Sequence, residues 1–277
     1  MKKNYKIVAS DLDGTLLAKD QTVSRENLDA IAAMRKAGIE FVPTTGRALC
    51  EIPEALITSP SIRYFITSDG AVVWDNAEKK TLLTEYIPTD LVKFMLDTIR
   101  PYTVYTVVHE SGVTYYDPEK HTDEYLTACR LDSYFRHIID TTAIPKPDFE
   151  NFLLNSDKVE MLAFFFETDE AIEACRRAFV ETGKLCAAHS AVNNLEVYVS
   201  KAGKGNTLAA LAKTLGVDLA DVIAVGDSNN DSTLIKTAGL GLAMANASDE
   251  LKAIADKTIC DRSEHCAKYI LEDFIDC

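Results

Sequence analysis

The chain carries near its start the stretch that decides its fold, YKIVASDLDGTLL, residues 5–17. Residues 5–9 form a short apolar run, which predicts a buried strand. Asp11 and Asp13 follow at once, and Gly14 allows a sharp turn where the strand ends. Ligands of open parallel sheets bind outside the carboxyl ends of the strands. The acidic turn is therefore a candidate site, although a turn that only closes the strand explains it equally well.

Helices and strands alternate on either side of the chain's middle. Ser24 is the expected cap of an amphipathic helix that ends at Gly38, and a second helix is expected after Arg47. The other strands predicted here are residues 39–42, 64–67, 222–225, 240–243 and 258–260, and the later helices are residues 207–215, 231–237 and 264–275. Such alternation with short connections predicts an α/β fold, with a Rossmann-like parallel sheet and helices on both of its faces.

The middle of the chain has a different order of predicted strands and helices. Its predicted strands are residues 103–108, 113–116, 158–166 and 195–199, and its predicted helices are residues 90–99 and 169–182. The first two strands read as a hairpin around Ser111 and Gly112. We therefore predict an α+β domain inserted into the parallel core. The expected divisions are 1–86 for the first part of the core, 87–190 for the inserted domain and 191–277 for the second part of the core.

The composition excludes several classes of protein. A chain of 277 residues with 47% hydrophobic residues can form one large or two modest globular domains. Its net charge of −14 argues against nucleic acid and anionic membranes as partners. No apolar run approaches the ~20 residues of a membrane-spanning helix. The seven cysteines are scattered without a Cys-x-x-Cys pair, which predicts reduced thiols and a cytoplasmic location.

Two motifs could hold an anion. Thr44, Thr45, Gly46 and Arg47 follow the second strand at an expected helix start, where backbone N–H groups can bind an oxyanion. Thr45 as a plain helix cap is the alternative. Lys204 lies between Gly203 and Gly205, but the spacing of a phosphate-binding Walker loop is absent. This lysine either reaches a phosphate as a point charge or is solvated in a flexible turn.

A second acidic turn follows a later strand. Asp227 and Asp231 come directly after the predicted strand 222–225, just as Asp11 and Asp13 follow the first strand. Asp231 alone is explained by a helix N-terminus, where an acid is favourable. Two acidic turns at equivalent positions of one sheet would repel each other unless a cation lay between them. Carboxylate oxygens suit Mg²⁺.

The four motifs, in this order, resemble those of the haloacid dehalogenase-like hydrolase superfamily. The inserted segment is similar to the α+β cap of its Cof-type branch, class IIB, and the resemblance covers essentially the whole chain. Further similar stretches are residues 67–71 and 241–247. The branch usually has Asn where Asp69 stands and Gly where Ala245 stands.

The resemblance implies a Mg²⁺-dependent phosphatase of small phosphorylated metabolites, such as sugar phosphates or phosphorylated cofactors. Asp11 would be the nucleophile that forms an aspartyl-phosphate, and Asp13 the general acid and then the base. The residues implied in phosphate binding are Leu12, Thr45, Gly46, Lys204 and Asn230. Those implied in metal binding are Asp11, Asp13, Asp227 and Asp231, with Asp231 either ligating the metal or positioning Lys204. Arg47 is expected to support its loop.

The inserted domain would act as a lid that selects the leaving group. Candidate selectivity residues are His109, Glu110, Tyr115, Tyr116, His189 and Asn194, each of which could instead serve packing. A sugar phosphomutase and a catalytically silent phosphate-binding protein remain alternatives. The sequence leaves the oligomeric state open.

Overall fold

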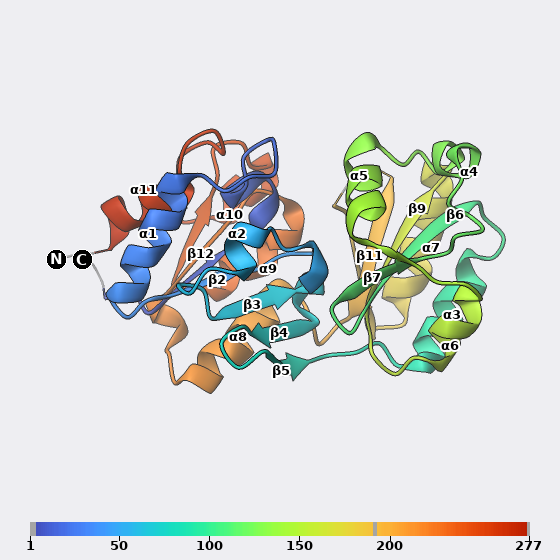
Figure 1. Ribbon diagram of the computed structural model, residues 1–277, viewed down its shortest axis with the longest axis horizontal. Coiled ribbons are helices and arrows are strands. Elements are labelled where there is room, and N and C mark those ends of the chain that lie inside the picture. Colours follow the sequence, from blue (N-terminus) through green and yellow to red (C-terminus); the bar gives the residue numbers. More distant parts are fainter. Residues whose placement is uncertain (1–3, 191–192, 276–277) are drawn as a thin grey trace. The chain divides into compact units, whose positions relative to one another are not determined.

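The computed structural model describes residues 4–190 and 193–275, which divide into two compact units (Figure 1). The core unit holds the described residues up to Gly46, Ile52–Thr84 and the described residues from Gly203 onward. The inserted unit holds Arg47–Glu51 and Glu85–Ala202. The chain therefore enters the inserted unit twice, once for only a few residues.

The core unit is built on a five-stranded parallel sheet with the strand order β14-β13-β12-β1-β2. Its strands are β1 (Ile7–Ser10), β2 (Glu40–Pro43), β12 (Val222–Gly226), β13 (Leu240–Ala243) and β14 (Lys257–Thr258). Its helices are α1 (Arg25–Lys36), α2 (Glu54–Ile57), α8 (Lys204–Leu215), α9 (Ser232–Thr237), α10 (Asp249–Ile254) and α11 (Cys266–Phe274). The prediction of a parallel α/β core is confirmed.

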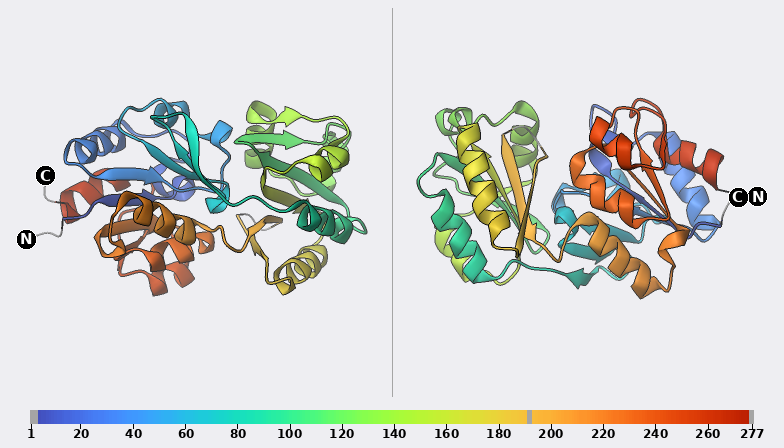
Figure 2. Two further views of the ribbon diagram at one scale, coloured as in Figure 1. Left: turned by 90° about the horizontal axis from the view of Figure 1, so that it is seen from below. Right: turned by 180° about the vertical axis from the view of Figure 1, so that it is seen from behind.

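Helices cover both faces of this sheet, as predicted. Ile7 and Ala9 of β1 point to the face on which Leu208 and Leu211 of α8 pack. Figure 2 shows α1 and α11 on the opposite side of the sheet from α8 and α9. Asn27 joins α1 to α11, because its Oδ1 accepts the N–H of Ala267 at 3.0 Å. Successive side chains of a strand point to opposite faces of the sheet. Since helices cover both faces, all residues of β1 are buried.

The third predicted strand does not continue the parallel sheet. β3 (Tyr64–Thr67) pairs antiparallel with β4 (Val72–Asp75), which pairs antiparallel with β5 (Lys80–Thr84). The expected β-α-β-α-β order is present, but the expected parallel pairing of β3 was wrong, and β4 and β5 were missed. The physical reason is the turn at Ser68–Gly70, where all three residues have positive φ and reverse the chain tightly. A parallel bridge between Thr44 and Ile66 still links β3 to the end of β2.

The helix expected after Arg47 is present only as short, separate segments. A short 3₁₀ turn at Leu49–Glu51 stands there, and α2 begins only after Pro53. Proline disfavours helical backbone in the residue before it, so a continuous helix from Arg47 is interrupted at Ile52. The motif around Thr45 therefore does not open a helix.

The inserted unit contains a six-stranded mixed sheet, in the order β10-β11-β9-β6-β7-β8. Its strands are β6 (Val104–Glu110), β7 (Val113–Tyr116), β8 (Ile144–Pro145), β9 (Val159–Phe166), β10 (Leu185–Ala188) and β11 (Asn194–Val199). Its helices are α3 (Thr89–Ile99), α4 (Asp123–Ala128), α5 (Ser133–Thr142), α6 (Phe149–Asn155) and α7 (Asp169–Glu181). The predicted hairpin is present, with Ser111 and Gly112 in its turn at positive φ. An inserted, largely antiparallel α+β unit is therefore confirmed.

The end of the inserted unit lies later in the chain than the predicted range. β11 pairs antiparallel with both β9 and β10, so the unit extends to Ala202. The predicted limit at residue 190 falls beside residues 191–192, which lie outside the described residues. The longest described helix, α7, has 13 residues, and no helix within 4–190 and 193–275 is long and apolar enough to cross a membrane.

Candidate active site

The centre of the candidate site is the ammonium group of Lys204, the first residue of α8. Its Nζ donates to Asp11 Oδ1 and to Asp231 Oδ1, each at 2.7 Å. Lys204 is 2% exposed, Asp11 5% and Asp231 0%. Burial alone would lower the pKa of Lys204, but Asp11 and Asp231 outweigh it and hold that pKa well above its usual value. The lysine therefore stays charged and binds the two acidic turns together.

The first acidic turn is shaped by Gly14. Asp11 leaves β1 in extended backbone, and Gly14 has a φ of +82°. A Cβ on Gly14 would lie 2.1 Å from Asp227 Oδ2, so only glycine fits against the second acidic turn. Asp11 also donates its N–H to Val225 O of β12 at 3.0 Å. Neighbouring parallel strands therefore bring the two turns to one edge of the sheet, as the sequence predicts.

Backbone N–H groups of the second acidic turn bind the carboxylate of Asp231. Its Oδ2 accepts the N–H groups of Asp227 and Ser228 at 3.1 and 3.2 Å. Since Oδ2 is occupied by backbone donors, Oδ1 is the oxygen that meets Lys204. A Cβ on Gly226 would lie 2.5 Å from Asp231 Cγ, so a glycine is also needed here. Asp231 is therefore held by backbone N–H groups on one oxygen and by Lys204 on the other.

Three carboxylates converge at this site. Asp11, Asp227 and Asp231 each offer an oxygen, and these oxygens lie within 4.8 Å of one another. Burial and then the charge of Asp231 raise the pKa of Asp227 to about 7. The same two causes, burial and Asp231, raise the pKa of Asp11 well above its usual value, against the opposing effect of Lys204. A divalent cation among these oxygens would remove this repulsion, so the donor set fits a hard metal ion.

Asp13 is half-buried and lies two residues beyond Asp11, in a backbone conformation that is not helical. Its charge contributes to the raised pKa values of both Asp11 and Asp227, after the causes given above. The turn therefore brings Asp13 into the electrostatic environment of both carboxylates. The residue between them, Leu12, is buried.

Thr45 lies at the end of β2, next to the strand that carries Asp11. The N–H of Thr44 donates to Ser10 O at 2.8 Å, and the N–H of Thr45 donates to Ile66 O at 2.9 Å. Thr45 is buried, and Gly46 after it is half-buried. The structure therefore places the Thr45 motif at the same sheet edge as Asp11, held by neighbouring strands.

Two further predicted residues have other local contacts. Asn230 is half-buried in the second acidic turn, and its Oδ1 accepts a hydrogen bond from Ser228 Oγ. Arg47 belongs to the inserted unit, where it donates to Glu51 O and to the Tyr134 hydroxyl, each at 3.1 Å. These contacts agree with the expectation that Arg47 supports its loop.

Sequence reasoning missed Asn246 as a member of this constellation. Its Nδ2 donates to Gly14 O at 2.9 Å and to Asp227 Oδ2 at 3.4 Å. Its Oδ1 accepts the N–H of Arg262 at 2.9 Å. Asn246 therefore ties the two acidic turns together. The stretch 241–247 resembles the family in sequence, but local pattern does not predict this contact.

The selectivity candidates of the inserted unit have different local contacts. His109 is buried beside Glu51, with 3.8 Å between Nε2 and Oε1. Tyr115 lies beneath Lys146 Nζ, and Tyr116 stacks on His121. Glu110 accepts a hydrogen bond from Ser156 Oγ. Asn194 exchanges hydrogen bonds with Ser190, and His189 is exposed.

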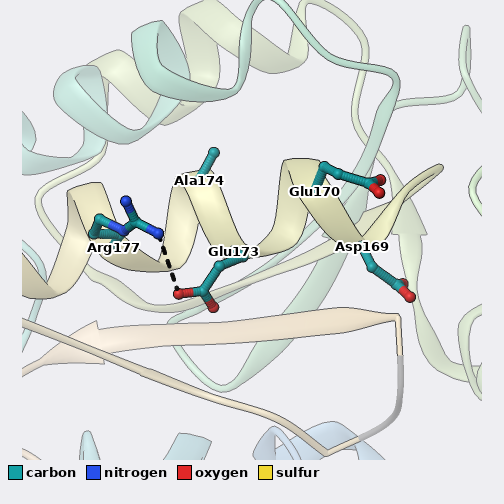
Figure 3. Close-up of a pocket in the computed structure, with 5 residues that line it drawn as sticks. All are labelled: Asp169, Glu170, Glu173, Ala174 and Arg177. Carbon is teal, nitrogen blue, oxygen red and sulfur yellow. Dashed lines mark ion pairs between the residues drawn. The ribbon is translucent and has the colours of Figure 1, made fainter.

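A hollow along α7 has no comparable chemistry (Figure 3). Its lining residues are Asp169, Glu170, Glu173, Ala174 and Arg177, all exposed. Arg177 and Glu173 form an ion pair of 3.8 Å. Charges on an exposed helix face are well solvated, so the buried aspartates and Lys204 of the core unit remain the candidate active site.

Comparisons with known proteins agree with this geometry. A family model described as haloacid dehalogenase-like hydrolase matches residues 8–270. Phosphatase YwpJ of Bacillus subtilis (strain 168) is 30% identical over 295 residues, covering 98% of this chain and 100% of that protein. The HMP-PP phosphatase of Yersinia pseudotuberculosis (strain YPIII) is 27% identical, covering 90% of this chain and 86% of that protein.

A solved structure extends the comparison to the whole fold. The structure of a haloacid dehalogenase-like hydrolase from B. subtilis matches with a TM-score of 0.83 and 28% identity. The match covers 98% of this chain and 100% of that chain. Family model, relatives and fold thus span both units, and the chain belongs to the haloacid dehalogenase-like hydrolase family, in the Cof-type branch that its motifs predicted.

Proposed function

We propose that this protein is a Mg²⁺-dependent phosphatase of small phosphorylated metabolites that works through an aspartyl-phosphate. The observation that carries the proposal is the buried Lys204, which holds Asp11 and Asp231 at 2.7 Å while Asp227 completes a set of converging carboxylates. A charged lysine and a site for a divalent cation suit a phosphate group, because phosphoryl transfer needs mainly positioning and charge neutralisation.

Asp11 is the proposed nucleophile. Lys204 occupies its Oδ1, so Oδ2 is the oxygen proposed to attack phosphorus. The phosphorus–ester oxygen bond breaks as the bond to Asp11 forms, and Asp13 gives its proton to the leaving oxygen. Water then attacks the phosphorus, Asp13 takes a proton from that water, and inorganic phosphate leaves Asp11. Both half-reactions thus use the same two carboxylates.

The remaining roles follow the family pattern. The side chains of Thr45, Lys204 and Asn230 and the backbone N–H groups of Leu12 and Gly46 are proposed to hold the phosphoryl oxygens. Asp11, Asp227, Asp231 and the Asp13 carbonyl are proposed to hold Mg²⁺. When bound, Mg²⁺ supplies positive charge that neutralises the phosphoryl group and the crowded carboxylates. Carboxylate oxygens of Asp11, Asp227 and Asp231 within 4.8 Å of one another support this proposal.

The substrate class is proposed from the relatives and the inserted unit. YwtE of B. subtilis, a relative 27% identical over 98% of this chain, is named as a 5-amino-6-(5-phospho-D-ribitylamino)uracil phosphatase. Phosphorylated sugars, sugar alcohols and phosphorylated cofactors are therefore the first compounds to test. The inserted unit is proposed to act as a lid that selects among them. A cytoplasmic location also belongs to the proposal, supported by the scattered cysteines.

The test is release of inorganic phosphate from p-nitrophenyl phosphate and from a panel of such metabolites, with Mg²⁺ or with EDTA. The wild type should need Mg²⁺, and Asp11→Asn should lose at least about a thousandfold in kcat. Asp29→Asn removes an exposed carboxylate on α1 and is the matched control, with activity unchanged. Equal activity of the wild type and Asp11→Asn would overturn the proposal. Conversion of a sugar phosphate to an isomer without free phosphate would instead identify a phosphomutase, and tight binding without turnover a binding protein.

A further inference from the structure

Asp69 is a buried carboxylate without a hydrogen-bond donor. The residue is 1% exposed, and neither Oδ1 nor Oδ2 has a hydrogen-bond partner among residues 4–190 and 193–275. Buried polar groups are nearly always hydrogen-bonded, and a buried carboxylate is unfavourable unless charge or donors compensate it. None of the roles proposed above uses Asp69. Its presence beside the active site therefore calls for a separate explanation.

The backbone of Asp69 links two parts of the site. Its N–H donates to Thr45 O at 3.1 Å, and its carbonyl accepts the N–H of Gly203 at 2.9 Å. Thr207 Oγ1 of α8 donates to Gly70 O at 2.6 Å. A Cβ on Gly70 would lie 2.6 Å from the carbonyl carbon of Gly203, so the two backbones are in close contact. The Ser68–Gly70 turn is therefore fixed between the Thr45 motif and the start of α8.

Lys204 directly follows Gly203, so this fixed turn is hydrogen-bonded to the residue that precedes the lysine. Lys204 already meets Asp11 and Asp231 by hydrogen bonds. Asp69 contributes, after burial and after these two aspartates, to the raised pKa of Lys204. Because no donor within residues 4–190 and 193–275 reaches its oxygens, Asp69 acts on the lysine through space. The ammonium in turn supplies the compensating charge that a buried carboxylate needs.

We propose that Asp69 is a positioning residue that weakens the hold of Lys204 on phosphate. Its negative charge offsets part of the positive charge that Lys204 presents to a phosphoryl group. The site then binds inorganic phosphate, the product, weakly, and product release is fast. Since product release limits many enzymes, this arrangement favours turnover over retention of phosphate. The inference rests on the proposed phosphatase function and concerns the same site.

The test removes the charge of Asp69 and keeps its backbone. Asp69→Asn is isosteric, and asparagine tolerates the φ of +50° found here. Asp69→Gly also suits that φ and serves as a second charge-removing variant. The matched control is Asp29→Asn, which removes an exposed carboxylate from α1. Each variant is assayed at saturating Mg²⁺ for inhibition of p-nitrophenyl phosphate hydrolysis by inorganic phosphate, sulfate and nitrate.

We expect the inhibition constant of inorganic phosphate to fall about tenfold in both Asp69 variants, the size of effect that one buried charge exerts over a short distance. KM for the substrate should fall with it, while kcat stays level or falls as release slows. A dianion feels the lost charge twice as strongly as a monoanion, so sulfate should tighten more than nitrate. A merely structural role of Asp69 would not separate these two anions. Asp29→Asn should leave all three inhibition constants unchanged.

An unchanged or weaker inhibition by phosphate in a folded Asp69 variant would overturn the inference, as would equal changes for sulfate and nitrate. If only one of the two variants folds, that variant decides. Titration calorimetry with inorganic phosphate measures the same affinity without turnover. Loss of activity in Asp11→Asn together with an unmoved phosphate affinity in Asp69→Asn rejects only the role of Asp69. Full activity of Asp11→Asn rejects the proposed function instead.

Discussion

Lys204 Nζ lies 2.7 Å from Asp11 Oδ1, and both residues are buried, with Lys204 2% and Asp11 5% exposed. The two residues are 193 positions apart in the chain. Their contact joins the end of the first strand to the first residue of α8, and the same ammonium also holds Asp231. Stability and the candidate chemistry of the core unit therefore depend on the same group.

Lys204→Met should destabilise the metal-free protein by about 3 kcal/mol, because it leaves Asp11 and Asp231 buried without a counter-charge. Mg²⁺ should restore part of this stability by supplying positive charge in its place. Urea unfolding in EDTA and in Mg²⁺ measures both effects. Lys213→Met, on an exposed position of the same helix, should change stability little. Equal loss of stability in the two variants would contradict the role given to Lys204.

Mg²⁺ affinity should depend on pH near neutrality. Burial and Asp231 raise the pKa of Asp227 to about 7, so protons compete with the metal below that value. The sign is that affinity is highest above about pH 7 and falls as pH is lowered. Between pH 8 and pH 6 the association constant should drop about tenfold for one such proton. Titration calorimetry at several pH values checks this, and an affinity that is the same at pH 6 and pH 8 would contradict it.

Gly14→Ala should disturb the site more than its backbone strain alone explains. The new Cβ would lie 2.1 Å from Asp227 Oδ2, at a φ of +82°. Gly38→Ala is the matched control, since Gly38 has a φ of +79° and no atom of the described residues lies within 4 Å of its Cβ position. The control should lose about 1 kcal/mol of stability from left-handed backbone. Gly14→Ala should lose more and also bind Mg²⁺ poorly, as seen by urea unfolding and calorimetry, whereas two equal losses would show that strain alone matters.

Asp75→Asn should lower stability at neutral pH but not in strong acid. Asp75 is buried, which pushes its pKa up, but Arg63 and the N–H groups of Glu78 and Ala77 outweigh burial and hold that pKa below its usual value. A depressed pKa contributes stability above the unfolded value of about 3.9, and this contribution disappears as pH falls through the folded pKa. The variant should lose about 1.5 kcal/mol at pH 7 in urea unfolding. A gap of the same size at pH 2 would contradict this account.

The sequence by itself determined the elements that local chemistry encodes. The predicted strand at residues 64–67 and the predicted strand at 240–243 coincide with β3 and β13, because apolar runs bounded by turn residues are unambiguous. Ser24 caps α1 by accepting the N–H of Asn27, and Gly38 follows at positive φ. Both acidic turns lie at the ends of neighbouring parallel strands, as the rule for such sheets requires.

Only the tertiary structure decided how β3 pairs, where the inserted unit ends and which residues share the site. Pairing depends on partners distant in the chain, so the antiparallel β3–β4–β5 sheet and the membership of β11 in the inserted sheet could not be derived from local pattern. Asn246 meets Gly14 across 232 positions, and the carboxylate of Asp69 is buried without a hydrogen-bond partner among the described residues. Residue types and their spacing in the sequence indicate which chemical groups a site can contain. The distances between those groups, the burial of their side chains and their hydrogen-bond partners are decided only when the chain is folded.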